Sequence, residues 1–325
     1  MFKTPIAYIV FNRPRHTEQS FAILRKQQPS QLLIISDGPR IEHPTDAERC
    51  AEVRAIVERV DWPCEVYRHY AESNLGCKQR VSSGLDWVFA QVERAIILED
   101  DCLPHPDFFA FCEILLDRYA NDSRVWVITG NNFQNGRRCG KAAYYFSKYN
   151  HVWGWATWQR AWGHYKGDLA FWPQWKDSRD WRHKIPDQVE RKYWTMMFDK
   201  MYAGGIDTWD YPWTACVWYH GGLTATPNVN LVTNIGIGPD ATHTLAGDDC
   251  EGHPVHPLGP LTHPDRIGQD VSADHYLFDH HFGGIRLRWH RRLLRLLRRI
   301  IGHMAPHIRP AKVHVSPKKT DQYDN

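Results

Sequence analysis

The chain has 325 residues, of which 42% are apolar and 24% charged, so it is long enough for one large core or two smaller ones. No uncharged apolar run reaches about 18 residues, and residues 1–15 lack a long apolar segment with a small-residue cleavage site. We therefore expect neither a transmembrane span nor a secretory signal. Eight scattered cysteines without a CxxC pair argue against a disulfide scaffold or a zinc ribbon and favour reduced thiols in the cytoplasm.

The formal net charge of +3 is unevenly distributed along the chain. Residues 286–325 carry eleven Lys or Arg and two Asp, which leaves a net charge of −6 for residues 1–285. Such a basic tail would attract nucleic acid, but the body has no helix-turn-helix, zinc-finger or RNA-recognition signature. We therefore expect no nucleic-acid partner.

Short apolar β-rich runs alternate with segments of helical period from residue 5 to about 132, a pattern typical of βαβ units and a mainly parallel sheet. The predicted strands are Pro5–Phe11, Gln31–Asp37, Cys64–Tyr70, Arg94–Asp100 and Arg124–Thr129. The predicted helices are 16–28, 45–60, 76–92 and 106–120, the last opened by Pro106 and Asp107.

Aromatic residues are concentrated after residue 132, where the stretch 144–181 holds seven tryptophans. They are either an aromatic core that holds irregular loops together or a cleft whose indoles stack on the apolar faces of sugars, and the sequence leaves both open. Further along, 185–202 has a helical pattern, and residues 246–270, rich in His and Pro, are expected to be an extended loop.

The sharpest local signal is the run IILEDD at 96–101. An unbroken apolar strand is buried on both faces, and its acids then fall at the carboxyl end, where open α/β sheets place their ligands. Adjacent carboxylates repel one another unless a cation lies among them. Glu99, Asp100 and Asp101 therefore predict a divalent metal site.

The run NIGIGPDATH at 234–243 imitates a dinucleotide-binding fingerprint, but Pro239 and the polar loop after it leave no helix to receive a pyrophosphate. We reject a nicotinamide-dinucleotide site. The glycines instead favour a sharp turn close to a ligand, and His243 is a candidate metal or phosphate partner.

Two further groups of residues are candidates for the site. Arg13 and Asp37 follow the first two predicted strands and share the edge of the acid triplet, where Arg13 suits a phosphate or ring carbonyl and Asp37 a ribose or base donor. Asp207 and Asp210 flank Trp209, and either is a candidate general base. The chain has no P-loop, HExxH or GxSxG motif.

Six elements in order resemble the GT-A-fold, nucleotide-sugar-dependent glycosyltransferases, and most closely the N-acetylglucosaminyltransferases that start N-glycan branching. They span residues 5–245 and are IVFNR ending at Arg13, SDG at 36–38, LEDD at 98–101 with PDFF at 106–109, WGW at 153–155, WD at 209–210, and the glycine run closing at His243.

The resemblance implies an α/β fold with a mainly parallel, Rossmann-like sheet flanked by helices. It also implies a divalent ion, Mn²⁺ or Mg²⁺, bound by Asp101 on the donor diphosphate, with His243 as a second partner. Asp100 would contact a ribose or water, and Glu99 a hydroxyl of the transferred sugar. The remaining donor contacts that it implies are Arg13, Asp37, Lys78 and Trp155.

The catalytic base of the family lies in a Trp-Asp-Asp-Trp context, whereas this chain has WDYPW at 209–213. Asp210 is therefore favoured over Asp207. A single attack on the back face of the donor sugar implies an inverting transfer.

The segment 286–301, RLRWHRRLLRLLRRII, holds seven arginines and no acid, with its leucines and isoleucines at helical spacing. Such a basic amphipathic helix suits the interface of an anionic membrane. The alternative is a helix that packs on the catalytic domain or on a second subunit. Membrane binding would place the protein in the cytoplasm, at the inner face of the cell membrane, with a lipid-linked or surface saccharide as acceptor.

The predicted organisation has three parts. Residues 1–245 form a GT-A catalytic domain, divided into a nucleotide-sugar-binding half (1–132) and an aromatic acceptor half (133–245); a loop region (246–285) and a basic helix and tail (286–325) follow. The predicted function is metal-dependent transfer of a sugar from a nucleotide-diphosphate donor, with a UDP-type donor favoured. The alternatives are a sugar-phosphate nucleotidyltransferase and a non-catalytic carbohydrate-binding protein.

Overall fold

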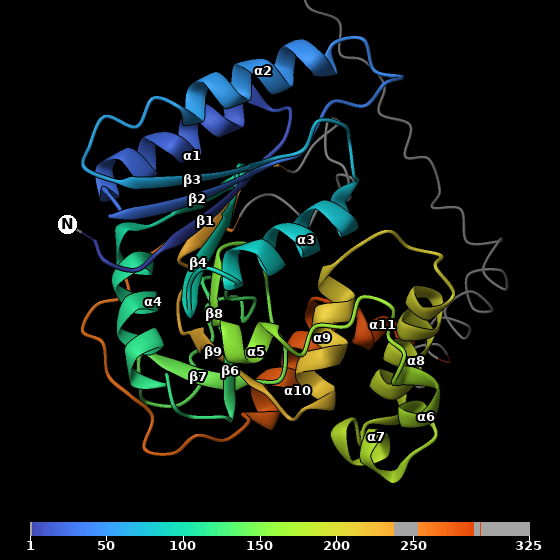
Figure 1. The fold of residues 1–325 in the computed structure, drawn as a ribbon. Helices are drawn as coiled ribbons and strands as arrows, with labels where there is room; N and C mark the ends of the chain where they lie inside the picture. The colour runs from blue at the N-terminus through green and yellow to red at the C-terminus, as the bar shows by residue number, and fades with distance from the viewer. Residues whose placement is uncertain (1, 237–252, 289–292, 294–325) are drawn as a thin grey trace, which may run out of the picture.

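The computed structural model describes residues 2–236, 253–288 and 293, and it has a large central β-sheet with helices on both faces (Figure 1). The sheet strands are β1 (Ile6–Val10), β2 (Gln31–Ser36), β3 (Glu65–Tyr70), β4 (Arg94–Glu99), β6 (Val125–Thr129), β7 (Tyr144–Ser147), β8 (Trp155–Trp158) and β9 (Leu223–Pro227). Their spatial order is β3-β2-β1-β4-β8-β6-β9-β7.

The first four strands in this order are parallel, because helical crossovers connect them. Strand β8 runs antiparallel to both β4 and β6, and β9 is again parallel to β6. The predicted α/β class, with a mainly parallel sheet flanked by helices, is confirmed. The five predicted strands and the four predicted helices of the first half are all present, each within two or three residues of its expected ends.

Two apolar cores, one on each face, hold the sheet between its helices. The helices around its first strands are α1 (Pro14–Gln27), α2 (Asp46–Val57), α3 (Cys77–Phe89) and α4 (Pro106–Arg118). Side chains of β1 alternate, so that Ile6, Tyr8 and Val10 pack toward α1, α2 and α4 while Ala7 and Ile9 pack toward α3. Figure 1 shows α1 and α2 on one side of β1–β3 and α3 on the other.

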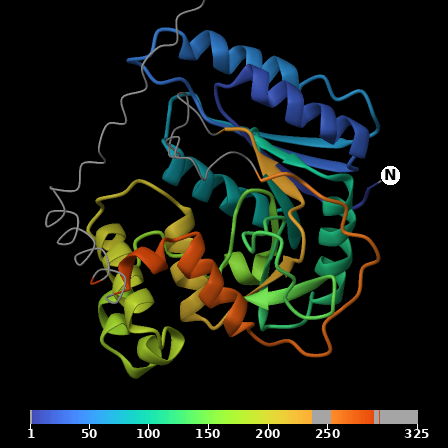
Figure 2. The ribbon, with the colours of Figure 1, turned by 180° about the vertical axis from the view of Figure 1, so that it is seen from behind.

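The second half adds a helical layer that packs on the face of α3. Its helices are α5 (Gln159–Trp162), α6 (Trp172–Lys176), α7 (Arg179–Lys184), α8 (Gln188–Tyr202) and α9 (Asp210–Tyr219). Helix α8 begins three residues later than predicted, after Pro186, and Asp187 caps it by accepting bonds from the backbone N–H groups of Val189 and Glu190. Figure 2 shows this layer from behind.

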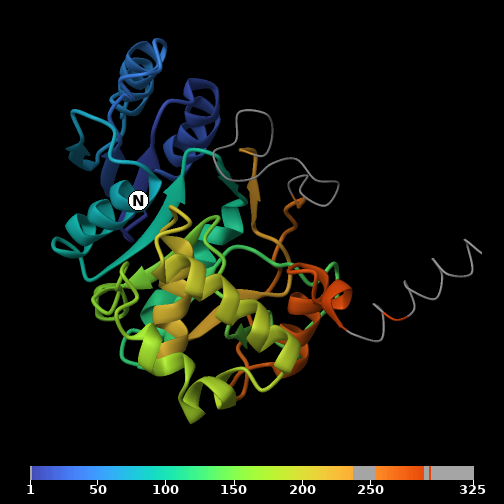
Figure 3. The same cartoon turned by 90° about the vertical axis from the view of Figure 1, so that its right-hand side faces the viewer.

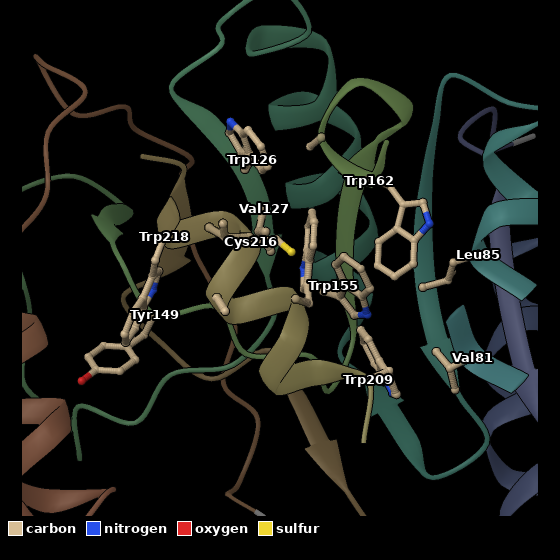
Figure 4. Close-up of a cluster of buried hydrophobic side chains, with 14 of the residues drawn as sticks. Val81, Leu85, Trp126, Val127, Tyr149, Trp155, Trp162, Trp209, Cys216 and Trp218 are labelled. Carbon is tan, nitrogen blue, oxygen red and sulfur yellow. The ribbon is translucent and has the colours of Figure 1, made fainter. Parts of the chain in front are cut away.

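The tryptophans of this half form an aromatic core. Six of the seven between residues 144 and 181 are no more than 5% exposed, and only Trp153 is partly exposed. The Trp155 and Trp209 rings stack with centroids 5.6 Å apart, and Trp162 and Trp213 pack around them (Figure 4). The structure thus supports the aromatic-core interpretation, and six of these indoles offer no open face to a sugar.

The predicted loop region 246–285 requires a correction. Residues 253–270 form no helix, but Val271–His280 forms helix α10, which Asp270 caps. Leu277 and Phe278 of α10 are buried in the aromatic core, so this part of the chain belongs to the main body.

The predicted basic helix also begins differently. A short helix α11 (Gly284–Leu287) starts before residue 286, and Arg288 then has an extended backbone with φ −70° and ψ 135°. Apart from Arg286–Arg288 and residue 293, the segment 286–301 lies outside the described residues. Among the helices that the structure describes, none is long and apolar enough to cross a bilayer.

Candidate active site

The predicted site residues lie where β1, β2 and β4 end at a common level. Val10 pairs with Ser36 and Ile9 with Glu99, so Arg13, Asp37 and the acid triplet all leave the sheet at one edge. Strand β1 lies between β2 and β4: the chain passes from β1 to β2 and β3 on one side and then crosses back to β4 on the other side of β1. Such a switch point opens a crevice in which α/β proteins bind ligands.

Arg13 pairs with two acids of the triplet. Its Nη2 lies 2.5 Å from Asp100 Oδ1 and its Nη1 lies 3.0 Å from Asp101 Oδ2. The backbone N–H of Phe11 also donates to Asp100, at 3.3 Å. The cation that separates these carboxylates in the structure is therefore a guanidinium of the chain itself, whereas the sequence analysis assigned that role to a metal and paired Arg13 with the ligand.

One guanidinium does not neutralise this edge. Burial raises the pKa of Glu99, the neighbouring charge of Asp101 raises it further, and Arg13 opposes both effects. Burial likewise raises the pKa of Asp100, with Arg13 acting against it. Because their negative charge is disfavoured here even beside Arg13, these carboxylates gain from a further cation.

Asp37 ties two loops together. Its Oδ1 accepts from the backbone N–H groups of Gly38 (2.8 Å) and Leu75 (2.9 Å), and its Oδ2 accepts from Asn74 Nδ2 at 3.0 Å. A Cβ on Gly38 would come within 2.5 Å of the Ser73 backbone, so only glycine permits this approach. Asp37 is 5% exposed and orders the loop that leads into α3.

The start of α3 is surrounded by carboxylates. Burial raises the pKa of the Cys77 thiol, and the charges of Glu99, Asp210, Asp207 and Asp37 raise it further. Asp37 accepts from the Leu75 N–H and Asp207 lies beside Gly76, while Glu99 and Asp210 act on the thiol through their charge. The structure therefore brings both candidate bases to the same site as the strand-end acids.

Asp210 and Asp207 differ in their surroundings. Asp210 is half-buried at the first residue of α9, where it accepts hydrogen bonds from Thr208 Oγ1 and from the backbone N–H of Tyr211. Asp207 is exposed, and a Cβ on Gly76 would lie 3.4 Å from its Oδ2. Asp210 is thus the more firmly positioned of the two, because Trp209 before it packs on Trp155.

The glycine run begins against the acids. Strand β10 (Val232–Asn234) pairs antiparallel with β5 (Cys102–Pro104), and the Ile235 N–H donates to the Asp101 carbonyl at 2.8 Å. A Cβ on Gly236 would come within 2.2 Å of Asp101 Oδ2 and 2.7 Å of Arg13 Nη1. The glycine therefore permits the backbone to pass close to Asp101 and Arg13; the predicted approach of this run to a ligand stays a prediction. His243 lies outside the described residues.

The side chains of Glu99, Asp100 and Asp101 suit Mn²⁺ or Mg²⁺ in type, because these ions prefer oxygen ligands. Within the described residues, no three His, Cys, Asp or Glu side chains form a preassembled metal site. An ion held by one or two carboxylates together with the phosphates of a donor does not need such a site. The side chain of Asp101 is 12% exposed and that of Asp100 2%, so Asp101 is the more open of these two aspartates to an ion.

Two predicted donor contacts have different environments. Lys78 is half-buried in the first turn of α3, near the acid-rich edge. Trp155 is fully buried in the aromatic core, so its assignment to the donor site is corrected: it supports Trp209 and does not face a ligand.

Two features of the site were not predicted from the sequence. Asp210 lay in a segment without a predicted element, although an acid at the first position and Pro212 in the first turn are typical of a helix start. Cys77 was not a candidate, because nothing in the sequence indicates that the charges of four distant acids act on this thiol.

No protein-family model matches the chain, and no curated protein matches it. Similar solved structures include a mannosyltransferase, PcManGT, from Pyrobaculum calidifontis in complex with GDP-Man and Mn²⁺, with 14% identity and a TM-score of 0.35. That match covers 47% of this chain and 44% of the mannosyltransferase, so the chain spans less than half of its length.

Two nucleotide-related structures are also similar. The 4-diphosphocytidyl-2C-methyl-D-erythritol synthase from Anaerococcus prevotii has 12% identity and a TM-score of 0.31, over 61% of this chain and 85% of that one. HddC from Yersinia pseudotuberculosis, complexed with GMP-PN, has 5% identity and a TM-score of 0.30, over 48% and 77%. At these identities and scores the likeness assigns neither a family nor an activity.

Proposed function

We propose that the protein is a glycosyltransferase that moves a sugar from a nucleotide-diphosphate donor, UDP-linked by preference, to a saccharide or lipid-linked saccharide. The observation that carries the proposal is the meeting of Arg13, the triplet 99–101, Asp207 and Asp210 at one edge of the sheet. This reaction needs charged groups that bind the donor diphosphate, directly or through a metal ion. It also needs a separate carboxylate that takes the proton of the acceptor hydroxyl.

On the donor side, the roles follow from position. Asp37 and the loop that it orders would contact the ribose and base, and Arg13 would contact the base or a phosphate after exchanging part of its pairing with Asp100. Glu99 would bind a hydroxyl of the transferred sugar, because its raised pKa allows it to donate as well as accept a hydrogen bond. Lys78 would face the donor phosphates.

Asp101 would hold a divalent ion on the donor diphosphate, with His243 as a further ligand. When bound, such an ion offsets the negative charge that develops on the leaving diphosphate. Gly236 keeps this space open, since any larger residue there would strike Asp101 and Arg13.

Asp210 would accept the proton of the acceptor hydroxyl. Its carboxylate is fixed at the first residue of α9 by hydrogen bonds from Thr208 Oγ1 and from the backbone N–H of Tyr211. Attack from this side, opposite the leaving diphosphate, inverts the configuration of the transferred sugar. We further propose that the protein works in the cytoplasm, held at the inner face of the membrane by segment 286–301.

A hydrolysis screen of UDP-, GDP-, CMP- and dTDP-sugars with Mn²⁺ tests the proposal. We expect slow release of nucleotide from one donor, fastest from a UDP-sugar. Release of pyrophosphate from a nucleoside triphosphate and a sugar phosphate would instead identify a nucleotidyltransferase. Binding of saccharides without any response to UDP and Mn²⁺ in calorimetry would identify a carbohydrate-binding protein. Product NMR that showed retained configuration would disprove inversion.

A further inference from the structure

A basic groove of about 610 Å³ is lined by residues of α6, α7 and α8. Figures 1 and 3 show these helices side by side in the second half of the molecule. Five of its lining residues are cationic and one is acidic: Lys176, Arg182, Arg191, Lys192, Lys200 and Asp199. This concentration of positive charge contrasts with residues 1–285 as a whole, whose net charge is −6.

One side of the groove is a single face of α8. Two rows of residues at i, i+4 spacing line it: Gln188, Lys192, Met196 and Lys200 in one row, and Arg191, Thr195, Asp199 and Ala203 in the other. Trp181, 2% exposed, lies at the base of the groove, and its Nε1 donates to Thr195 Oγ1 at 3.1 Å. The groove is therefore built on packed helices and not on a loop.

Most cations of the groove have no carboxylate partner among the described residues. Asp199 Oδ1 accepts from Lys176 Nζ (3.1 Å) and Trp172 Nε1 (2.9 Å), so its charge is already shared. In the part of the chain that the structure describes, no carboxylate pairs with Arg182, Lys192 or Lys200, and all three are exposed. Clustered like charges repel one another, and a bound anion relieves that repulsion.

Exposed apolar side chains accompany these charges. Met196, which lines the groove, is 47% exposed, and Tyr202 at the end of the same helix is 51% exposed. Cations beside exposed apolar residues suit the boundary between lipid headgroups and acyl chains, whereas a soluble anion would use the cations alone.

The start of the basic C-terminal segment lies next to one end of the groove. Arg288 Nη1 lies 2.7 Å from Oδ2 of Asp187, the residue that caps α8 immediately before Gln188 in the groove. We propose that this groove binds the phosphate headgroups of an anionic lipid surface, as a second membrane contact within the folded domain. This contact goes beyond the proposed function. It does not depend on segment 286–301, and it requires no transferase activity.

Co-sedimentation with vesicles tests this site, using the full chain with its tail unchanged. The groove variant is Arg182→Glu/Lys192→Glu/Lys200→Glu. The control variant, Lys26→Glu/Arg49→Glu/Arg138→Glu, makes the same charge change at exposed cations elsewhere. On phosphatidylcholine vesicles that contain phosphatidylglycerol, we expect the groove variant to bind at least about tenfold more weakly than wild type, and the control no more than about threefold.

Each other outcome decides against the site. Equal losses in the two variants would show only a response to net charge. Wild-type binding that is as strong on pure phosphatidylcholine as on vesicles with phosphatidylglycerol would exclude recognition of anionic headgroups. Wild-type binding to heparin without binding to vesicles would assign the groove to a soluble polyanion. Circular dichroism checks that both variants are folded. A further variant, Met196→Ser/Tyr202→Ser, tests the apolar contact: it should weaken the vesicle binding that persists in high salt, where charge attraction is screened.

Discussion

The two halves of the molecule use their most conspicuous residues in opposite ways. In the first half, a short run of acids at the end of β4 meets Arg13 at the carboxyl edge of the sheet, and burial raises the pKa of Glu99 and Asp100. In the second half, tryptophans, the residues best suited to hold sugars, are almost all in the core. Residues kept in an unfavourable environment therefore mark the site better than residues of suitable chemistry do.

The two halves meet where β8 pairs with β4, and the stack of Trp155 on Trp209 extends this contact to the proposed base. Trp155 belongs to β8, which pairs with the acid-bearing strand β4, and Trp209 immediately precedes Asp210. Figure 4 shows Trp155 beside Trp209, with Val81 and Leu85 of α3 nearby. The aromatic core thus contributes to function by fixing the position of the proposed base relative to the proposed donor site.

The largest expected effect is at Asp210, and it sharpens the division between the two halves. Asp210→Asn removes the base while keeping its shape, and we expect kcat for sugar transfer to fall by about 10²–10⁴-fold with little change in donor KM. Asp207→Asn is the matched variant and should lose far less. A larger loss in Asp207→Asn would move the base to that residue.

Trp155→Ala offers the most direct way to break the comparison. Removal of a fully buried indole should lower the free energy of unfolding by about 3–5 kcal/mol, measured by urea denaturation followed by circular dichroism. Trp153→Ala, at the partly exposed position, should cost much less. A stable Trp155→Ala protein that had lost donor binding would show that this tryptophan belongs to the donor site after all.

Asp101→Asn tests the acidic edge itself. We expect about 10²–10³-fold slower nucleotide release and a higher Mn²⁺ concentration for half-maximal rate, because one charged ligand is lost. The control is Asp117→Asn, an exposed acid that pairs with Arg94 on the surface. Chelation of the metal should slow the wild type and leave Asp101→Asn less affected. An unchanged Mn²⁺ requirement in Asp101→Asn would contradict the assignment.

The smallest expected effect concerns pH and the C-terminal part of the body. His151 packs with His281 and His253 around Phe133, and burial lowers its pKa well below the usual value, with the two neighbouring histidines adding to the shift. Below its ordinary pKa, the unfolded chain takes up a proton that folded His151 does not, so stability is lost as pH falls.

His151→Gln should therefore reduce the stability that is lost between about pH 6.5 and 4.5 by roughly 2 kcal/mol. Urea denaturation across this range measures it, with the exposed His183→Gln as control. Identical pH slopes in wild type and His151→Gln would show that this histidine is not held neutral by the fold.

The sequence by itself determined the first half of the fold and the location of the acids. Apolar runs such as Ile96–Leu98, buried on both faces, and helices opened by Pro14 or Pro106 are local patterns, and the carboxyl ends of parallel strands must share one edge. The position of Arg13, Asp37 and the triplet at that edge followed from this rule.

Only the tertiary structure decided what the ambiguous residues do. An indole is equally suited to a core or to a sugar, so the burial of Trp155 depended on which segments pack against β8. Three features depend on contacts between separate elements. They are the pairing of Arg13 with Asp100 and Asp101, the approach of Asp207 to the start of α3, and the basic groove along α8. Local pattern carries no information about such contacts, because they form only when separate elements dock.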